Sequence, residues 1–279
     1  MNESERIHMI AICGTGMAAL AGLLKKTGHH VTGSDQSIYP PMSTLLEQDH
    51  ILCKQGYSPD HIAPDTDRVI IGNAVSKDNP EVIETLRRAL PYLSMASAVG
   101  TYFLKDKHAL VVAGTHGKTT TSSLLASILT TAGKDPSALI GGWVNHFNSN
   151  HRLGSGPFFV VEGDEYDTAF FDKGPKFLHY RPEHAILTSI EFDHADIFPD
   201  IEAVRHAFQQ FVQLIPKSGL LLAAAEYEEI TQVTQNLPCR VEQYGIETEE
   251  PEQSSAPHWQ ARAIRQNEAF LEFEVWYQH

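Results

Sequence analysis

Short apolar runs alternate with stretches of helical spacing through the first hundred residues. Apolar runs at residues 7–13, 30–34 and 68–71 have the length of strands, and residues 14–27 and about 80–90 have helical periodicity. Strands that are separated by helices predict a parallel sheet. We therefore expect an α/β fold with a Rossmann-like parallel-sheet domain at the N-terminus.

The same alternation restarts after a charged break at residues 105–108, Lys-Asp-Lys-His. This break places a domain boundary near residue 106 and divides the chain into residues 1–105 and 106–279. The second unit is predicted to be a further α/β domain, with strands from residue 109 and at 158–161, 185–189 and 219–224, and with helices at 122–131 and from 201 to about 214.

The C-terminal part of the sequence has a different pattern. Residues 247–257 are polar and are expected to form a mobile loop. Beyond them Leu271, Phe273, Val275 and Tyr277 alternate with mostly polar residues, which predicts a strand with one buried face. The sequence stops on this strand, so we expect the second domain to be incomplete.

Composition narrows the class of protein. The 279 residues suffice for about two domains, and 35 acidic against 21 basic residues give a formal charge of −14, which disfavours binding to nucleic acid. No apolar run approaches the ~20 residues of a membrane span and the N-terminus does not resemble a secretory signal, so we expect a cytoplasmic protein without membrane association. Cys13, Cys53 and Cys239 lack metal-binding or redox spacing, so reduced thiols are expected.

A phosphate-binding motif is predicted between the first strand and the first helix of the second unit. Residues 111–121 read Val-Val-Ala-Gly-Thr-His-Gly-Lys-Thr-Thr-Thr. Glycines let backbone N–H groups face an anion, Lys118 adds a positive charge, and the Thr119 hydroxyl is a ligand for Mg²⁺. The usual motif has a glycine where this chain has Val112, and here the glycine is displaced to Gly114. The alternative is a glycine turn with an incidental lysine, but strand, loop and helix stand in the order that nucleoside triphosphate binding requires.

A second glycine cluster follows the first predicted strand. Residues 13–19 read Cys-Gly-Thr-Gly-Met-Ala-Ala, and Asp35 follows at the distance typical of a dinucleotide fingerprint. Taken alone, the cluster fits a nicotinamide cofactor, another nucleotide diphosphate or a tight turn without a ligand. Asp35 could equally be a helix N-cap.

Carboxylates follow the predicted strand at 158–161. Glu162 comes first after the strand and is the best candidate for holding Mg²⁺, because phosphate-loop enzymes place an acidic residue at the end of a neighbouring strand. For Asp164, Glu165 and Asp167, a solvated acidic loop is as good an interpretation as a metal site.

A histidine follows the next predicted strand. Residues 190–196 read Ile-Glu-Phe-Asp-His-Ala-Asp and contain His194. Because parallel strands bring their carboxyl ends to one edge of a sheet, Lys118, Glu162 and His194 are expected to converge there. This convergence favours a chemical role for His194 over a structural one.

At these strand ends the chain resembles the Mur ligases, the ATP-dependent amide-forming enzymes of peptidoglycan synthesis. Residues 114–121 are similar to that family's form of the phosphate loop, which accounts for the displaced glycine. The resemblance covers nearly the whole chain and implies a UDP-binding Rossmann-like domain followed by a P-loop NTPase-like central domain. Further similar stretches lie at residues 33–35, 39–47, 69–74, 165–173 and 191–198.

The resemblance also implies which residues bind which ligand. The UDP-sugar site that it implies consists of Gly14, Thr15, Gly16, Met17, Asp35 and Asn73. The ATP site that it implies consists of Gly114, Thr115, His116, Gly117, Lys118, Thr119 and Thr120. The implied catalytic residues are Lys118, Glu162 and His194. The implied Mg²⁺ ligands are Thr119, Glu162 and His194.

The resemblance implies a reaction as well. ATP phosphorylates the carboxylate of UDP-N-acetylmuramate, an amine attacks the acyl phosphate, and phosphate leaves. The likeness is strongest to members that add L-alanyl-γ-D-glutamyl-meso-diaminopimelate, a murein tripeptide. Members that add L-alanine are the nearest alternative, and residues 206–211 lack the lysine that several other members carry. From another class, a nicotinamide-dependent oxidoreductase or a non-catalytic nucleotide-binding module is the alternative.

The family continues into a Gly-x-His-Asn segment and a C-terminal domain that grips the amine, and this sequence contains neither. We therefore expect the chain alone to bind UDP-N-acetylmuramate without ligating it. The sequence predicts no particular oligomeric state.

Overall fold

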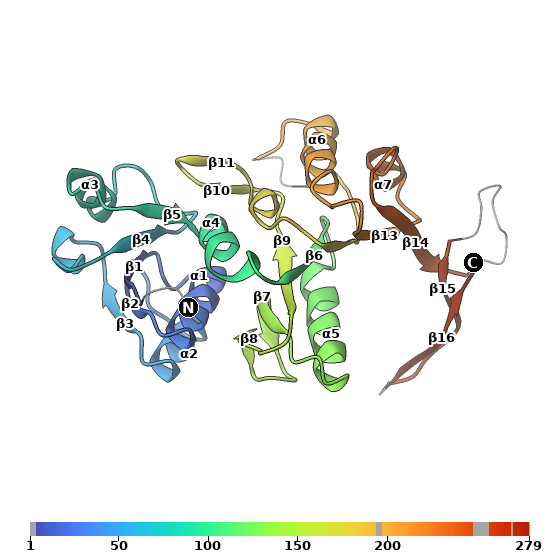
Figure 1. The fold of residues 1–279 in the computed structure, drawn as a ribbon, viewed down its shortest axis with the longest axis horizontal. Coiled ribbons are helices and arrows are strands. Elements are labelled where there is room, and N and C mark those ends of the chain that lie inside the picture. The colour runs from blue at the N-terminus through green and yellow to red at the C-terminus, as the bar shows by residue number, and fades with distance from the viewer. Residues whose placement is uncertain (1–3, 194–196, 248–256, 269, 279) are drawn as a thin grey trace.

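The computed structural model describes residues 4–193, 197–247, 257–268 and 270–278. Two sheets follow one another along the chain and lie side by side (Figure 1). The first sheet belongs to the N-terminal unit and the second to the unit that begins at β6, and together they form the predicted α/β fold.

The first sheet has five parallel strands in the order β3-β2-β1-β4-β5. Its strands are β1 (Arg6–Ile10), β2 (His30–Asp35), β3 (Leu52–Gln55), β4 (Arg68–Ile71) and β5 (Tyr92–Ser94). Its helices are α1 (Thr15–Lys26), α2 (Met42–Gln48) and α3 (Pro80–Arg87), with the short turn η1 at Pro59–His61. The predicted strands and helices are confirmed, whereas the short β3 and β5 were not predicted.

Alternation along β1 explains how this sheet is covered on both faces. Met9 packs in the same cluster as the buried side of α1, and its neighbour Ile10 packs with Val82 of α3. Successive side chains of a strand point to opposite faces, so one buried strand serves two layers.

The second sheet has nine strands in the order β16-β15-β14-β13-β12-β6-β9-β7-β8. The pairs β7·β8 and β15·β16 are antiparallel, and the other neighbours are parallel. Its strands are β6 (His108–Ala113), β7 (Ser137–Val144), β8 (Ser149–Arg152), β9 (Phe158–Gly163), β12 (His184–Leu187), β13 (Leu220–Ala224), β14 (Arg240–Ile246), β15 (Trp259–Gln266) and β16 (Leu271–Tyr277).

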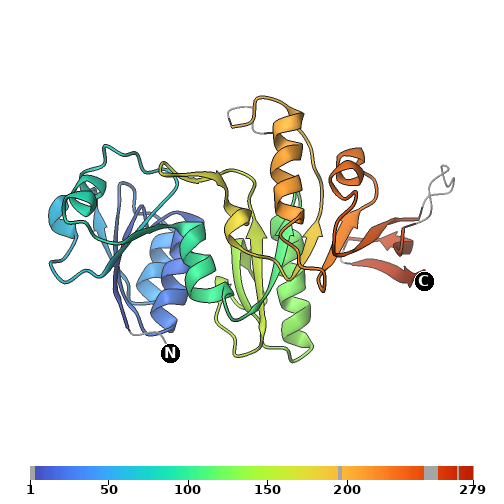
Figure 2. The same ribbon diagram turned by 45° about the horizontal axis from the view of Figure 1, so that its top comes forward.

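Helices cover both faces of the second sheet (Figure 2). Val160 of β9 packs with α5 (Lys118–Thr131), while Phe159 and Val161 belong to the cluster that contains α6 (Ile201–Val212). The remaining elements are α7 (Glu228–Val233), the hairpin of β10 (Asp167–Ala169) and β11 (Asp172–Pro175), and the turn η3 (Lys176–His179). The predicted helices and strands of this unit are confirmed.

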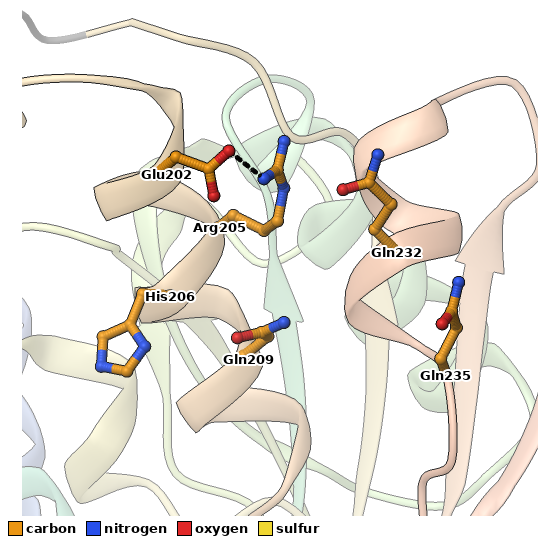
Figure 3. A pocket seen from close by; sticks show the side chains of 6 residues that line it. All are labelled: Glu202, Arg205, His206, Gln209, Gln232 and Gln235. Atoms are coloured by element: carbon orange, nitrogen blue, oxygen red, sulfur yellow. Dashed lines mark ion pairs between the residues drawn. The ribbon is translucent and has the colours of Figure 1, made fainter.

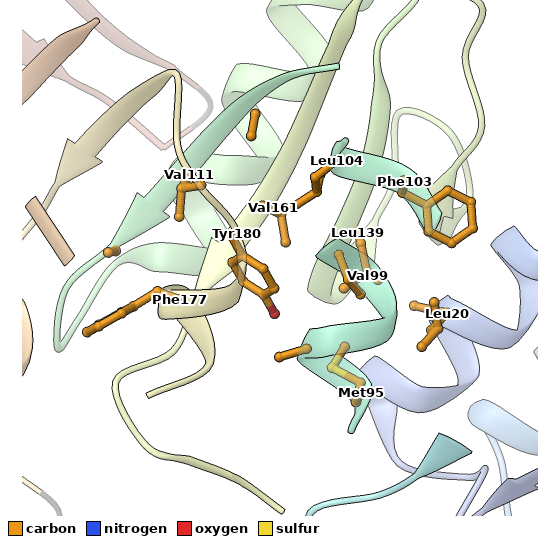
Figure 4. Packing of buried hydrophobic residues seen from close by; sticks show 14 of the residues in the cluster. Leu20, Met95, Val99, Phe103, Leu104, Val111, Leu139, Val161, Phe177 and Tyr180 are labelled. Carbon is orange, nitrogen blue, oxygen red and sulfur yellow. The ribbon is translucent and has the colours of Figure 1, made fainter. Parts of the chain in front are cut away.

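One hydrophobic cluster runs through both units. The linking helices α4 (Met95–Val99) and η2 (Gly100–Leu104) lie between α1 and the second sheet. Figure 4 shows Leu20 of α1 facing Val99 and Phe103, with Leu139 of β7 behind them. Burial of these side chains holds the two units together.

The expectation of a buried face on the last strand is wrong. Leu271, Phe273 and Val275 of β16 are 59%, 50% and 63% exposed. The reason is that no residue of β15 or β16 belongs to a hydrophobic cluster of the described chain, so neither face of this edge hairpin is covered by an apolar layer. The polar loop predicted at residues 247–257 falls almost wholly outside the described residues.

Two further observations concern the sequence expectations. Cys13, Cys53 and Cys239 are free thiols. Over the described ranges, no helix combines the length and apolar character that crossing a membrane requires.

Candidate active site

The phosphate loop connects β6 to α5 and has a backbone that only glycine adopts easily. Gly114 has φ +138° and Gly117 has φ +79°. A Cβ atom on Gly114 would lie 2.2 Å from Thr188 Oγ1 and 2.8 Å from the Ser189 amide nitrogen. The displaced glycine of the motif is therefore required where the loop passes the end of β12.

Hydrogen bonds fix the loop to the residues that follow β12. The Thr115 N–H donates to the Ser189 carbonyl at 3.0 Å. The His116 N–H donates to the Ser189 hydroxyl at 2.9 Å. The Glu191 N–H donates to the Thr115 hydroxyl at 2.9 Å. At the other end of the loop the Thr121 N–H donates to the Gly117 carbonyl at 3.0 Å and closes the first turn of α5. The earlier N–H groups of a helix have no acceptor within it, so those of the first turn of α5 are suited to an anion.

Lys118 is folded over this loop. Its Nζ donates to the Gly114 carbonyl at 2.6 Å and to Glu165 Oε2 at 3.1 Å. Glu165 is only 2% exposed. The interpretation of Glu165 as part of a solvated acidic loop is therefore wrong, and sequence reasoning did not anticipate that it pairs with Lys118.

Glu162 lies at the end of β9 next to Thr119. Its Oε2 accepts a hydrogen bond from the Thr119 hydroxyl at 3.0 Å, and its Oε1 accepts from the Gly141 N–H at 2.7 Å and the Ser122 hydroxyl at 3.2 Å. Burial raises the pKa of Glu162 above its ordinary value, although the hydrogen bonds from Gly141 and Thr119 oppose the shift.

The Thr119–Glu162 pair fits one Mg²⁺ ion. Neighbouring ligands of an octahedral ion with Mg–O distances of about 2.1 Å are about 3 Å apart, which is the separation of these two oxygens. Hydroxyl and carboxylate oxygens are also the ligand type that Mg²⁺ prefers. Elsewhere, the described part of the chain holds no group of three or more His, Cys, Asp or Glu side chains that could bind a metal ion.

The third predicted strand end, residues 190–196, is described only as far as residue 193. Glu191, three residues before His194, donates its N–H to the hydroxyl of Thr115 in the phosphate loop. His194, the predicted catalytic residue and Mg²⁺ ligand, lies outside the described residues. The structure therefore brings Lys118, Thr119 and Glu162 together and leaves His194 without a described position.

The first glycine cluster lines a pocket of about 690 Å³. Every predicted UDP-sugar residue contributes to the lining: Gly14, Thr15, Gly16, Met17, Asp35 and Asn73. The Asp35 carboxylate accepts hydrogen bonds from the Cys13 N–H at 2.8 Å and the Ser37 N–H at 3.0 Å. Asp35 therefore ties the glycine cluster to the end of β2 in addition to lining the pocket.

Two residues of the second unit also line this pocket, and sequence reasoning missed both. They are Tyr166 and Lys176. Lys176 Nζ pairs with Asp164 at 3.0 Å and lies 4.2 Å from the centre of the Tyr166 ring. The segment after β9 thus reaches the phosphate loop through Glu165 and the pocket through Tyr166. The sequence signals were the closeness of Asp164 and Tyr166 to Glu162 and the place of Tyr166 in the family-like stretch 165–173.

A separate hollow of about 540 Å³ lies between α6 and the region of α7 (Figure 3). Arg205 is near its centre and pairs with Glu202 and with Glu229 at 2.6 Å. Its lining contains neither phosphate-loop residues nor members of the first glycine cluster. The candidate active site is therefore the region from the 690 Å³ pocket to the phosphate loop.

Each of the two units matches a model of a known protein family. Residues 6–106 match the model described as Mur ligase family, catalytic domain, and residues 112–279 match the Mur ligase middle domain. The chain belongs to the Mur ligase family. The phosphate loop and Glu162 fall within the middle-domain match, and the first glycine cluster falls within the other.

Individual relatives carry the names of ligases. The chain is 43% identical over 259 residues to UDP-N-acetylmuramate–L-alanyl-gamma-D-glutamyl-meso-2,6-diaminoheptandioate ligase of Escherichia coli strain K12, covering 93% of this chain and 55% of the relative. It is 35% identical over 246 residues to UDP-N-acetylmuramate–L-alanine ligase of Clostridium kluyveri, covering 88% of this chain and 52% of that protein. The chain thus spans about half the length of the curated relatives that it matches.

A solved structure also resembles this fold. The crystal structure of UDP-N-acetylmuramate:L-alanyl-gamma-D-glutamyl-meso-diaminopimelate ligase from Neisseria meningitides superposes with a TM-score of 0.87 at 39% identity, covering 98% of this chain and 84% of that one. The Mur ligase fold therefore extends over nearly all of the chain.

Proposed function

We propose that this chain is part of an ATP-dependent Mur ligase of peptidoglycan synthesis and recycling. The ligase joins the carboxylate of UDP-N-acetylmuramate to the amine of L-alanyl-γ-D-glutamyl-meso-diaminopimelate. One observation carries the proposal: the segment after β9 lines the glycine-cluster pocket through Tyr166 and pairs with phosphate-loop Lys118 through Glu165. A nucleotide sugar in the pocket would thus lie beside a triphosphate on the loop.

Each of the two units binds one ligand. Residues 1–105 bind UDP-N-acetylmuramate, with the diphosphate at the N-terminus of α1 and the nucleoside toward Asp35 and Asn73. Residues 106–279 bind ATP through the phosphate loop and the first turn of α5. Both ligands are cytoplasmic metabolites, so we expect the reaction in the cytoplasm.

The residues at hand suit phosphoryl transfer to a carboxylate. A carboxylate oxygen of the sugar attacks the γ-phosphorus and ADP leaves; the amine then attacks the acyl carbon, loses a proton and displaces phosphate. Lys118 and the loop N–H groups stabilise the charge on the transferring group, for which Lys118 must leave Glu165. Thr119 and Glu162 would hold Mg²⁺, which when bound would supply further neutralisation of charge on the phosphate oxygens, and His194 is proposed as a ligand of a second ion.

The tripeptide is favoured over L-alanine as the amine substrate. The relative named for the tripeptide derivative is 43% identical to this chain, against 35% for the relative named for L-alanine. The nicotinamide alternative has lost its support, because the glycine cluster on which it rested lies within the match to the Mur ligase family.

Calorimetric titration of this chain tests the proposal. We expect binding of UDP-N-acetylmuramate with about one site per chain and no response to NADH. Binding of NADH without binding of UDP-N-acetylmuramate would overturn it. If the whole ligase releases phosphate when L-alanine is supplied and not when the tripeptide is supplied, L-alanine is the amine substrate and the tripeptide proposal is wrong.

A further inference from the structure

The β7–β8 hairpin of the second unit packs on helix α1 of the first unit (Figures 1 and 2). Asn150 of β8 is completely buried, and its Nδ2 donates a hydrogen bond to the Thr15 carbonyl at 3.0 Å. Thr15 is the first residue of α1 and lines the nucleotide pocket. A side chain of the ATP-binding unit therefore anchors the turn of α1 that faces the proposed diphosphate.

A second contact fits the same hairpin to α1. His151 is 1% exposed, and its Nε2 lies 2.7 Å from Lys26 Nζ and 3.2 Å from Asp49 Oδ2. A Cβ atom on Gly22 would lie 2.2 Å from the same nitrogen. The absence of a side chain at Gly22 thus creates the space on α1 that the imidazole fills, and His151 Nδ1 lies 3.1 Å from Asn150 Oδ1, so the two side chains act together.

The other strand of this hairpin reaches the proposed Mg²⁺ site at the level of Asn150, because Gly141 and Gly142 lie between the pairs Leu139–His151 and Val144–Ser149. Gly141 of β7 donates its N–H to Glu162 Oε1 at 2.7 Å. A Cβ atom on neighbouring Gly142 would lie 2.7 Å from the Thr119 methyl carbon. One hairpin of paired strands therefore contacts the phosphate-loop pair Thr119–Glu162 and the first turn of α1.

We propose that Asn150 is a positioning residue that sets the diphosphate end of α1 relative to the phosphate loop. The inference rests on the proposed function in taking the glycine cluster as the UDP-N-acetylmuramate site. Phosphoryl transfer between ligands held by two units requires a fixed spacing between them, and small displacements of reacting groups are costly in rate. The Asn150 amide and the His151 ring supply that spacing through α1.

Replacement of Asn150 by leucine tests the inference on this chain. Leucine has a similar size and no N–H donor. We expect the Kd for UDP-N-acetylmuramate to rise about tenfold, as the loss of about 1.4 kcal/mol predicts, because the Thr15 carbonyl loses its anchor. The Kd for a non-hydrolysable ATP analogue with Mg²⁺ should stay within about twofold. Asn145→Leu, in the exposed turn of the same hairpin, is the matched control and should change neither constant.

Gly22→Ala is the second variant, because it alters no polar group. Alanine has a higher helix propensity than glycine, so the substitution does not weaken α1 through its backbone. The added methyl group collides with His151, and we expect the same selective rise in the Kd for UDP-N-acetylmuramate.

The outcomes separate the inference from the proposed function. If wild-type chain binds UDP-N-acetylmuramate and Asn150→Leu binds it equally well, the inference is overturned and the function stands. A parallel loss of both ligands with a lowered melting temperature would make Asn150 merely structural and also overturn it. If wild-type chain does not bind UDP-N-acetylmuramate, the function and the inference fall together.

Discussion

The Thr119 hydroxyl donates a hydrogen bond to the Glu162 carboxylate at 3.0 Å, across the gap between the start of α5 and the end of β9. The carboxylate is buried, and the Gly141 N–H and Ser122 hydroxyl hold its other oxygen. These contacts keep the two oxygens at the spacing that neighbouring ligands of one Mg²⁺ ion would have. A buried carboxylate without a cation is costly, so this arrangement favours ligand binding over the stability of the free protein.

Glu162→Gln should separate binding from stability. Glutamine can keep the acceptor for Gly141 and Ser122 and can donate to the Thr119 oxygen, while the desolvated charge disappears. We expect the free protein to be at least as stable as wild type in thermal unfolding. Calorimetry should show at least a tenfold weaker Kd for the ATP analogue in the presence of Mg²⁺. If Glu162→Gln binds the ATP analogue with Mg²⁺ as tightly as wild type does, Glu162 is not a Mg²⁺ ligand.

Lys118→Ala should weaken binding of the ATP analogue at least tenfold, because a charged hydrogen bond to phosphate contributes about 1.5–3 kcal/mol. Binding of UDP-N-acetylmuramate should stay within about twofold of wild type. Loss of both ligands would show that the proposed division between the units is wrong.

The Lys118→Ala variant also leaves Glu165 buried without its partner, which destabilises the fold. The double variant Lys118→Ala/Glu165→Gln corrects for this effect. Its melting temperature should recover relative to the single variant, while binding of the ATP analogue stays weak. Recovery of both would mean that Lys118 acts only through stability.

Gly114→Ala should destabilise the chain by about 3 kcal/mol, since its φ of +138° is nearly exclusive to glycine and the methyl group would overlap Thr188 Oγ1. Gly133→Ala is the matched control. Its φ is +69° and nothing lies within 4 Å of the added Cβ atom, so it should cost about 1 kcal/mol. Urea unfolding measures both, and equal losses would contradict the close approach of the loop to β12.

Stability should fall in acid because of Glu81, which is fully buried at the start of α3. Burial alone would raise the pKa of Glu81, but hydrogen bonds from His8 and Ser34 lower it below the ordinary value of 4.5. A carboxyl whose pKa is lower in the folded state stabilises it above pH 4.5, and this contribution disappears as the pH falls through the folded pKa.

The Glu81→Gln variant measures that contribution. Its unfolding free energy at pH 7 should be lower than that of wild type by about 2 kcal/mol, and the difference should shrink as the pH falls below 4.5. Glu47→Gln, at an exposed position of α2, should leave the pH dependence unchanged. A constant difference between Glu81→Gln and wild type at every pH would assign the effect to packing.

The sequence by itself determined the alternation of strands and helices and the positions of both glycine motifs. These features are local: apolar spacing reports a strand or a helix, and a glycine at Gly114 or Gly117 reports a backbone with positive φ. The family resemblance then assigned ligands to the motifs. The short strands β3 and β5 were not predicted, because they contain too few apolar residues for their sequence pattern to differ from that of a loop.

Only the tertiary structure decided which side chains meet. Glu165 stands 47 residues from Lys118 in the sequence and Asn150 stands 135 residues from Thr15, yet each pair is within hydrogen-bonding distance. The same holds for β16, whose alternating pattern predicts a buried face, but no hydrophobic cluster of the described residues covers that face. Strand periodicity fixes which side chains share a face, but strand order and the packing of the two units decide what that face contacts.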